Sequence, residues 1–156
     1  MKPKLGLATK ARETVIARLA RLLADEHVLY IKTRNFHWNV TGPYFGPLHA
    51  LFENQYTALA GTIDEIAERL RSLGGVAPGS MKEFVKLSRL DEQPGGKLES
   101  AKMIAALLSD HEAVAGLLRE DIKVADEAGD VGTNDFLVSV LEAHEKTAWM
   151  LRAHLE

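Results

Sequence analysis

Two histidines and four carboxylates lie between residues 34 and 70, and these side-chain types can bind metal ions. The histidines are His37 and His49. The carboxylates are Glu53, Asp64, Glu65 and Glu68. Imidazole nitrogen and carboxylate oxygen, without sulfur, suit iron, manganese, zinc and other borderline divalent ions. Because the chain contains no cysteine, any metal site in it must use such ligands.

The spacing of these residues divides them into two half-sites. His49 and Glu53 are four residues apart, as are Asp64 and Glu68, so each pair shares one face of a helix. Glu65 points away from the face of Asp64 and Glu68 and is expected to be solvated. From His49 to Asp64 a helix rises by about 22 Å. One helix therefore cannot bring both pairs to one ion.

Two arrangements could complete the site: other helices of the same bundle, or a second copy of the chain. Internal di-iron sites typically use Glu-x-x-His on each of two helices, and this chain has no Glu followed three residues later by His. A two-fold axis near residue 57 or 58 instead places His49 of one subunit beside Asp64 and Glu68 of the other. A chain reversal near Pro43 brings His37 opposite His49. We expect two imidazoles from one subunit and two carboxylates from its mate.

The number of open coordination positions distinguishes an iron site that can react from a structural zinc site. A structural zinc site is normally closed and has four ligands. Iron is preferred if coordination positions stay open for an oxidant. The sequence alone therefore leaves the choice between iron and other divalent ions to whether such positions stay open.

The spacing of apolar residues predicts the helices that position these side chains. Long helices are expected over residues 9–38, 47–73, 98–128 and 133–156, with Thr133 as the N-cap of the last. Gly74 and Gly75 end the second helix, and a capping box, Ser80 to Glu83, begins a short helix in the connection that follows. No segment shows the alternating pattern of a strand. Four helices with one long middle connection are typical of an all-α, ferritin-like four-helix bundle.

Length, composition and charge limit the number of domains, the cellular location and the partners that are expected. The 156 residues, 46% of them hydrophobic, suffice for one domain, with 1–8 as a short tail and 9–156 as the bundle. No secretory leader or membrane-spanning run is apparent, so a soluble cytoplasmic protein is expected. The net charge of −3 gives no general attraction to nucleic acid. DNA binding would depend on a thin basic N-terminus: Lys2, Lys4, Lys10 and Arg12.

Three segments together suggest a family: "FHWNVTGPYFGPLHALFENQY", "IDEIAERL" and "AGDVGTND". With the helix lengths and the short crossover helix, the whole chain resembles the Dps family, the mini-ferritins named as DNA-binding proteins from starved cells. The resemblance implies a ferroxidase that forms hollow homo-oligomeric shells of twelve subunits built from two-fold dimers. Such shells oxidise ferrous iron, usually with hydrogen peroxide rather than oxygen, store the ferric mineral and need no organic cofactor.

The resemblance also assigns roles to individual residues. His37 and His49 match the histidine ligands, and Asp64 and Glu68 match the carboxylates donated across the dimer interface. Glu53 stands where the family commonly has an aspartate, so it binds metal either directly or through water. Trp38 resembles a tryptophan that can supply an electron and limit the escape of radicals.

Several residues outside this segment carry weaker expectations. Three acids near the start of the last helix, repeated about a three-fold axis, would form a negatively charged pore for ions: Asp126, Asp130 and Asp135. Four histidines are expected only to pack or to face solvent: His27, His111, His144 and His154. The alternatives to iron oxidation are a protective DNA-binding protein with little ferroxidase activity and a metal-free helical assembly or adapter.

Overall fold

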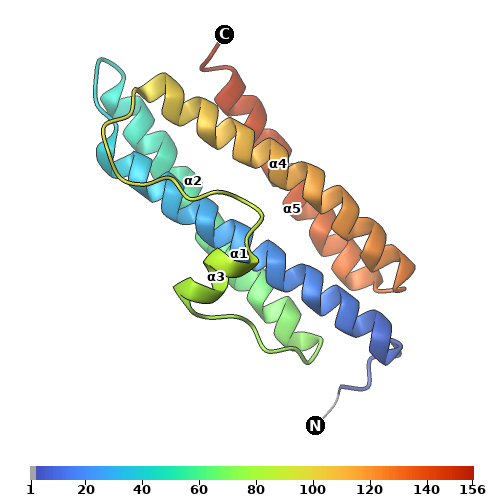
Figure 1. The fold of residues 1–156 in the computed structure, drawn as a ribbon. Helices are drawn as coiled ribbons and strands as arrows, with labels where there is room; N and C mark the ends of the chain where they lie inside the picture. Colours follow the sequence, from blue (N-terminus) through green and yellow to red (C-terminus); the bar gives the residue numbers. More distant parts are fainter. Residues whose placement is uncertain (1–2) are drawn as a thin grey trace.

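Four long helices and one short helix form the fold in the computed structural model, which describes residues 3–156 (Figure 1). They are α1 (Thr9–Asn39), α2 (Phe45–Ser72), α3 (Met81–Leu87), α4 (Ser100–Glu127) and α5 (Val131–Arg152). No strand occurs in this described range. The predicted ferritin-like four-helix bundle with a short crossover helix is confirmed.

The bundle consists of two helical hairpins packed against each other. α1 pairs with α2 and α4 pairs with α5, while α1 also packs on α4 and α2 has few direct contacts with α5. Large apolar side chains are fully buried between them, including Leu22, Phe36, Phe52, Leu107 and Leu118. Burying one such side chain stabilises the fold by about 1.5–3 kcal/mol. Within residues 3–156, no helix has the length and apolar character needed to cross a bilayer.

The start of α5 differs from the sequence-based prediction. Asp130, not Thr133, is the N-cap, because the Asp130 carboxylate accepts a hydrogen bond from the Thr133 backbone N–H at 3.0 Å. The Thr133 hydroxyl donates to the same carboxylate at 2.6 Å. The prediction of Thr133 as the cap was therefore wrong by three residues, since both residue types are good caps and only the backbone geometry distinguishes them.

The crossover between α2 and α4 runs the length of the bundle, because α2 ends near one end of the molecule and α4 begins near the other (Figure 1). The predicted capping box is present: Ser80 accepts from the Glu83 backbone N–H, and the Glu83 carboxylate accepts from the Ser80 backbone N–H. Phe84 is buried and stacks on the His27 ring of α1, with ring centroids 3.7 Å apart. These contacts dock α3 on the first helix.

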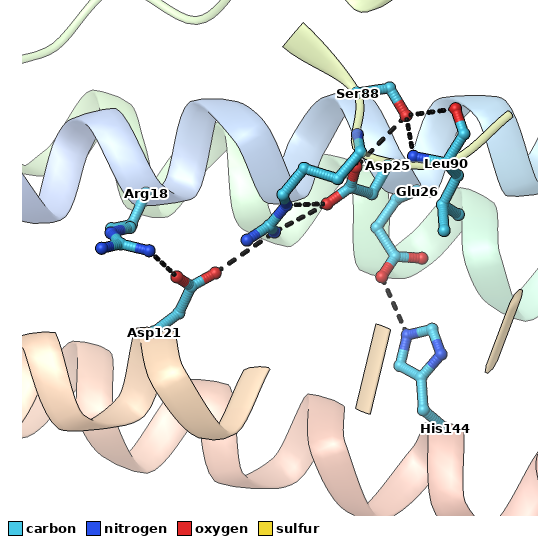
Figure 2. Close-up of polar contacts among 8 residues, drawn as sticks. Arg18, Asp25, Glu26, Ser88, Leu90, Asp121 and His144 are labelled. Carbon is cyan, nitrogen blue, oxygen red and sulfur yellow. Dashed lines mark hydrogen bonds and ion pairs between the residues drawn. The ribbon is translucent and has the colours of Figure 1, made fainter. Parts of the chain in front are cut away.

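A buried carboxylate also ties the crossover to the bundle (Figure 2). Asp25 of α1 is fully buried and accepts four hydrogen bonds: from the Ser88 hydroxyl, the Arg89 backbone N–H, and Arg89 Nε and Nη2. Arg89 also pairs with Asp121 of α4, which in turn pairs with Arg18. Burial raises the pKa of Asp25, and the hydrogen bonds and charge of Arg89 oppose this effect. One arginine thus links the crossover to two long helices.

Candidate metal site

His37 and His49 meet at the reversal between α1 and α2. His37 lies in the last turn of α1 and His49 in the second turn of α2. Gly42, with φ of +107°, allows the sharp reversal of the chain between them. The two imidazole rings stack with centroids 3.7 Å apart and an interplanar angle of 21°. The predicted approach of His37 to His49 is therefore confirmed.

Each histidine fixes the orientation of the other. His37 Nδ1 lies 2.8 Å from the His49 carbonyl oxygen, and His49 Nδ1 lies 2.8 Å from the His37 carbonyl oxygen. A carbonyl oxygen only accepts hydrogen bonds, so both Nδ1 atoms carry the proton and donate it. In a neutral imidazole the Nε2 atom then keeps its lone pair. The reciprocal bonds thus leave both Nε2 atoms as free ligand atoms, which is the arrangement that metal-binding histidines require.

Aromatic rings pack around the histidine pair, and the sequence analysis did not assign them a role. The Tyr56 ring meets His37 edge to face at 5.3 Å, and the Phe45 ring lies 5.0 Å from that of His49. Tyr56 is seven residues after His49, two helical turns along the same face of α2, so spacing could have identified it. These rings hold the imidazoles in place and limit their rotation.

Trp38, expected to act in electron transfer, points away from the buried side of α1. It is 62% exposed, and the Arg34 guanidinium lies over its ring at 4.8 Å. The same guanidinium lies 5.6 Å from the centre of the Tyr56 ring. Arg34 therefore links Trp38 to the aromatic rings around the histidine pair, and the redox role of Trp38 stays a prediction.

Among the described residues, the carboxylates predicted as ligands do not complete a metal site with the histidines of the same chain. Glu53, Asp64 and Glu68 are all exposed on α2, as is Glu65, the carboxylate expected to face solvent and not to bind metal. Within residues 3–156, no group of three or more His, Asp or Glu side chains is close enough to bind one ion. One subunit therefore has two imidazoles where α1 and α2 meet and, farther along α2, a separate pair of exposed carboxylates, Asp64 and Glu68.

The three acids predicted to line a pore have different environments. Asp126 and Asp135 are exposed. Asp130 is only 3% exposed, caps α5 and forms an ion pair with Arg69 at 2.7 Å. The Asp130 charge is therefore paired with Arg69 inside the subunit. A negatively charged pore would have to rely on the exposed Asp126 and Asp135.

Comparisons with known proteins place this geometry in a family. A sequence model of the ferritin-like domain matches residues 16–156. The chain is 40% identical to DNA protection during starvation protein 2 of Bacillus anthracis, over 90% of this chain and 96% of that protein. It is 44% identical to an uncharacterized low temperature-induced protein of a Nostoc species, over 97% of this chain and 86% of the relative.

Solved structures agree with these sequence relatives. The crystal structure of a Dps protein from Vibrio cholerae superimposes with a TM-score of 0.94 at 32% identity, covering 100% of this chain and 98% of that one. That protein is described as a member of a broad superfamily of ferritin-like diiron-carboxylate proteins. The likeness extends over the whole bundle and includes the crossover.

Proposed function

Because this chain belongs to the Dps family of ferritin-like proteins, we propose that it is a ferroxidase that oxidises ferrous iron and stores the ferric product. The oxidant is hydrogen peroxide or oxygen. The site is shared between two subunits, with His37 and His49 from one and Asp64 and Glu68 from the other. Glu53 is a further ligand, direct or through water, and the dimers assemble into a dodecameric shell.

The observation that supports this proposal best is the reciprocal histidine pair. Both imidazoles are fixed with Nδ1 protonated, so two Nε2 lone pairs are available before any iron arrives. No carboxylate of the same described chain completes a three-ligand site with them. Exposed Asp64 and Glu68 are free to meet a partner subunit, and antiparallel packing of α2 on its copy brings them to the histidines.

The chemistry follows from the ligand types. Ferrous iron is the substrate, and its two nitrogen and two oxygen ligands leave further positions open for the oxidant. Two ferrous ions supply one electron each to hydrogen peroxide, which takes up two protons and becomes two water molecules. The carboxylates stabilise the higher charge of the ferric product. When two ferrous ions supply their electrons to the same peroxide, no hydroxyl radical is released, and the reaction protects the cell as it stores iron.

Peroxide-driven oxidation in a ligand variant tests this proposal. We expect anaerobic loading with ferrous iron, followed by peroxide, to give ferric absorbance in the wild type. In the His49→Ala variant the rate should fall at least about tenfold, since loss of even a supporting group around a metal ligand costs 10–100-fold. The exposed His154→Ala substitution is the matched control and should keep the wild-type rate. Equal rates in His49→Ala and the wild type would refute the site.

Protection of DNA by direct binding is the alternative function, and the N-terminal side chains support it poorly. Arg12 is buried and donates a hydrogen bond to the Leu73 carbonyl oxygen, so little of its side chain is exposed to a phosphate. Lys4 and Lys10 are exposed, whereas Lys2 lies outside the described residues. Because Arg12 is buried, the N-terminus has fewer exposed basic side chains than the sequence indicates.

We therefore expect little or no retardation of linear DNA at about 150 mM salt and at most weak retardation at low salt. The affinity of such binding falls steeply with salt because it depends on lysine–phosphate contacts. A gel-shift series over salt concentration measures this, with the Lys4→Ala/Lys10→Ala variant as control. Strong retardation at 150 mM salt that this variant abolishes would instead favour the DNA-binding function. A cytoplasmic or nucleoid location remains a prediction.

A further inference from the structure

Three aromatic rings surround one positive charge beside the histidine pair. Tyr30, Arg34 and Trp38 follow one another at intervals of four residues, so they share one face of α1. Tyr56 of α2 completes the group, because its ring meets the Tyr30 ring edge to face with centroids 6.0 Å apart. The central carbon of the guanidinium, Cζ, lies 4.8 Å from the centre of the Trp38 ring and 5.4 Å and 5.6 Å from those of the two tyrosines. These four side chains form the Arg34 cluster.

The Arg34 charge has no other partner to neutralise it in the part of the chain that the structure describes. Its Nη1 atom donates a hydrogen bond to the Tyr30 phenol oxygen at 3.1 Å. Its Nε atom is buried and lacks a hydrogen-bond partner within residues 3–156. The ion pairs of this range do not include Arg34. The full positive charge therefore acts on the three rings.

The rings of the cluster lie close to the place where peroxide is proposed to react. The Tyr56 ring is 5.3 Å from the ring of His37, a proposed iron ligand. Tryptophan and tyrosine are among the side chains that lose an electron most easily. If only one ferrous ion is present, peroxide obtains one electron from iron and lacks the second. A nearby ring is then the alternative electron donor.

Such a reaction balances with Trp38 as the donor. The ferrous ion gives one electron and becomes ferric, and the indole gives one electron and its N–H proton. Together with one further proton from solvent, these convert hydrogen peroxide into two water molecules. A neutral indole radical remains on the protein. The ease of this side reaction depends on how readily the ring gives up its electron.

A cation held over an aromatic ring opposes the loss of that electron. The attraction arises from the negative face of the ring, and it is stronger where water is excluded. Removing an electron from the ring weakens this attraction, so the guanidinium stabilises the reduced ring more than the oxidised one. The hydrogen bond that Arg34 donates to Tyr30 acts in the same direction, because it withdraws electron density from the phenol oxygen.

We propose that Arg34 makes the three surrounding rings poorer electron donors and thereby keeps iron as the source of electrons for peroxide. Arg34 is not among the proposed iron ligands and acts only through the rings. The consequence for peroxide chemistry rests on the proposed ferroxidase function, whereas the effect of the charge on the rings does not. The two parts therefore need separate measurements.

The second tryptophan of the chain provides a matched reference. Trp149 of α5 is 62% exposed, as is Trp38. Among the described residues, the cation contacts with aromatic rings all come from Arg34, and none involves Trp149. The two indoles thus have equal exposure in the subunit and differ in the neighbouring charge. Trp149→Phe leaves Trp38 as the sole tryptophan, and Trp38→Phe leaves Trp149.

The first measurement uses the iron-free full chain with Trp149→Phe as the parent. In pulse radiolysis the neutral azide radical takes one electron from the Trp38 indole and becomes azide, while the indole loses its N–H proton to water. Equilibration with a neutral aromatic amine then measures how readily Trp38 is oxidised. We expect Arg34→Gln to shift this equilibrium toward the Trp38 radical by at least about threefold, the ratio that corresponds to one cation–π contact. Arg34→Lys keeps the charge without the planar stacking and should lie between the two.

The controls separate the effect of the charge from a change in folding. In the Trp38→Phe background, Arg34→Gln should leave the oxidation equilibrium of Trp149 unchanged. Circular dichroism and the size of the assembly should match those of the parent. If Arg34→Gln fails to fold, the two parents decide, since Trp149 should be oxidised at least about threefold more readily than Trp38. Equal equilibrium constants for Trp38 in folded parent and folded Arg34→Gln would overturn the proposal.

The second measurement tests the consequence for peroxide. One ferrous ion per histidine pair is added to protein with both tryptophans, followed by peroxide, and peptide mass spectrometry gives the oxidised fraction of each indole. Arg34→Gln should raise this fraction at least about threefold at Trp38 and leave it unchanged at Trp149. If the ferroxidase proposal is wrong, iron will cause no such rise, yet the pulse-radiolysis shift will remain. No rise at Trp38 in Arg34→Gln protein that oxidises iron normally would refute the control of electron supply by Arg34.

Discussion

Two inactive variants of this protein should restore activity to each other when their subunits are mixed. His37→Ala/His49→Ala removes the imidazoles, and Asp64→Asn/Glu68→Gln removes the negative charges of the carboxylates. Each variant alone should lose peroxide-driven iron oxidation by on the order of 100-fold or more, because it removes two ligands from every site. In a mixed dimer one site carries both defects, whereas the other combines intact histidines with intact carboxylates.

The recovered activity can be calculated from the geometry of sharing. With equal amounts of the two subunits assembled at random, about a quarter of the sites are intact. Co-expression with two different affinity tags, tandem purification and a stopped-flow oxidation assay measure this. Mixing the purified shells without dissociation is the control and should give no recovery. Failure of the co-assembled protein to recover activity would show that the histidines and carboxylates act within one subunit, or that one set is not needed.

Removal of the Asp25 carboxylate should produce the largest loss of stability. Asp25→Ala takes away four hydrogen-bond acceptor contacts and leaves Arg89 bonded only to Asp121. Breaking a buried ion pair by removing one partner costs about 3–5 kcal/mol, since the other charge stays poorly compensated. We expect the free energy of unfolding, measured by guanidinium titration at fixed subunit concentration, to fall by about 3 kcal/mol. The crossover should also become sensitive to proteolysis.

A matched double variant tests whether the stability lost in Asp25→Ala comes from breaking the Asp25–Arg89 ion pair or from a general weakening of core packing. Asp25→Leu/Arg89→Met replaces both charges with apolar side chains, and such replacement is often neutral or stabilising. We expect it to recover most of the stability that Asp25→Ala loses. The exposed pair Arg119 and Glu145 provides a surface control, because removing Glu145 should cost less than about 1 kcal/mol. A loss of similar size in Asp25→Ala and Glu145→Ala would contradict the tethering role of Asp25.

The sequence predicted the helices well because their signals are local. Apolar residues at helical spacing, Gly74 after α2 and the capping box at Ser80 and Glu83 each act within a few residues of chain. The end of α1 and the position of α3 follow from such signals. The start of α5 was mispredicted because Asp130 and Thr133 are both suitable caps, and the geometry of the turn, together with Arg69 from α2, selects Asp130.

The buried polar residues were accessible to sequence analysis only in part. Glu26 lies between Leu22 and Leu29 on the buried face of α1, and His111 lies between Leu107 and Val114 on that of α4. A polar residue on an apolar face indicates a buried partner. It does not identify that partner, because Glu26 and His144 are 118 positions apart in the chain.

What the sequence by itself determined was the set of candidate ligands and their division into two half-sites. The types of the candidate ligands, and the rise of about 22 Å between His49 and Asp64 along one helix, follow from residue order and helix geometry alone. The tertiary structure decided which atoms are available. Packing of α1 against α2 directs each Nδ1–H of His37 and His49 to the other's carbonyl oxygen and so frees both Nε2 atoms. It also buries Asp130, because hydrogen bonds between distant segments depend on how whole helices pack and not on the spacing within any one of them.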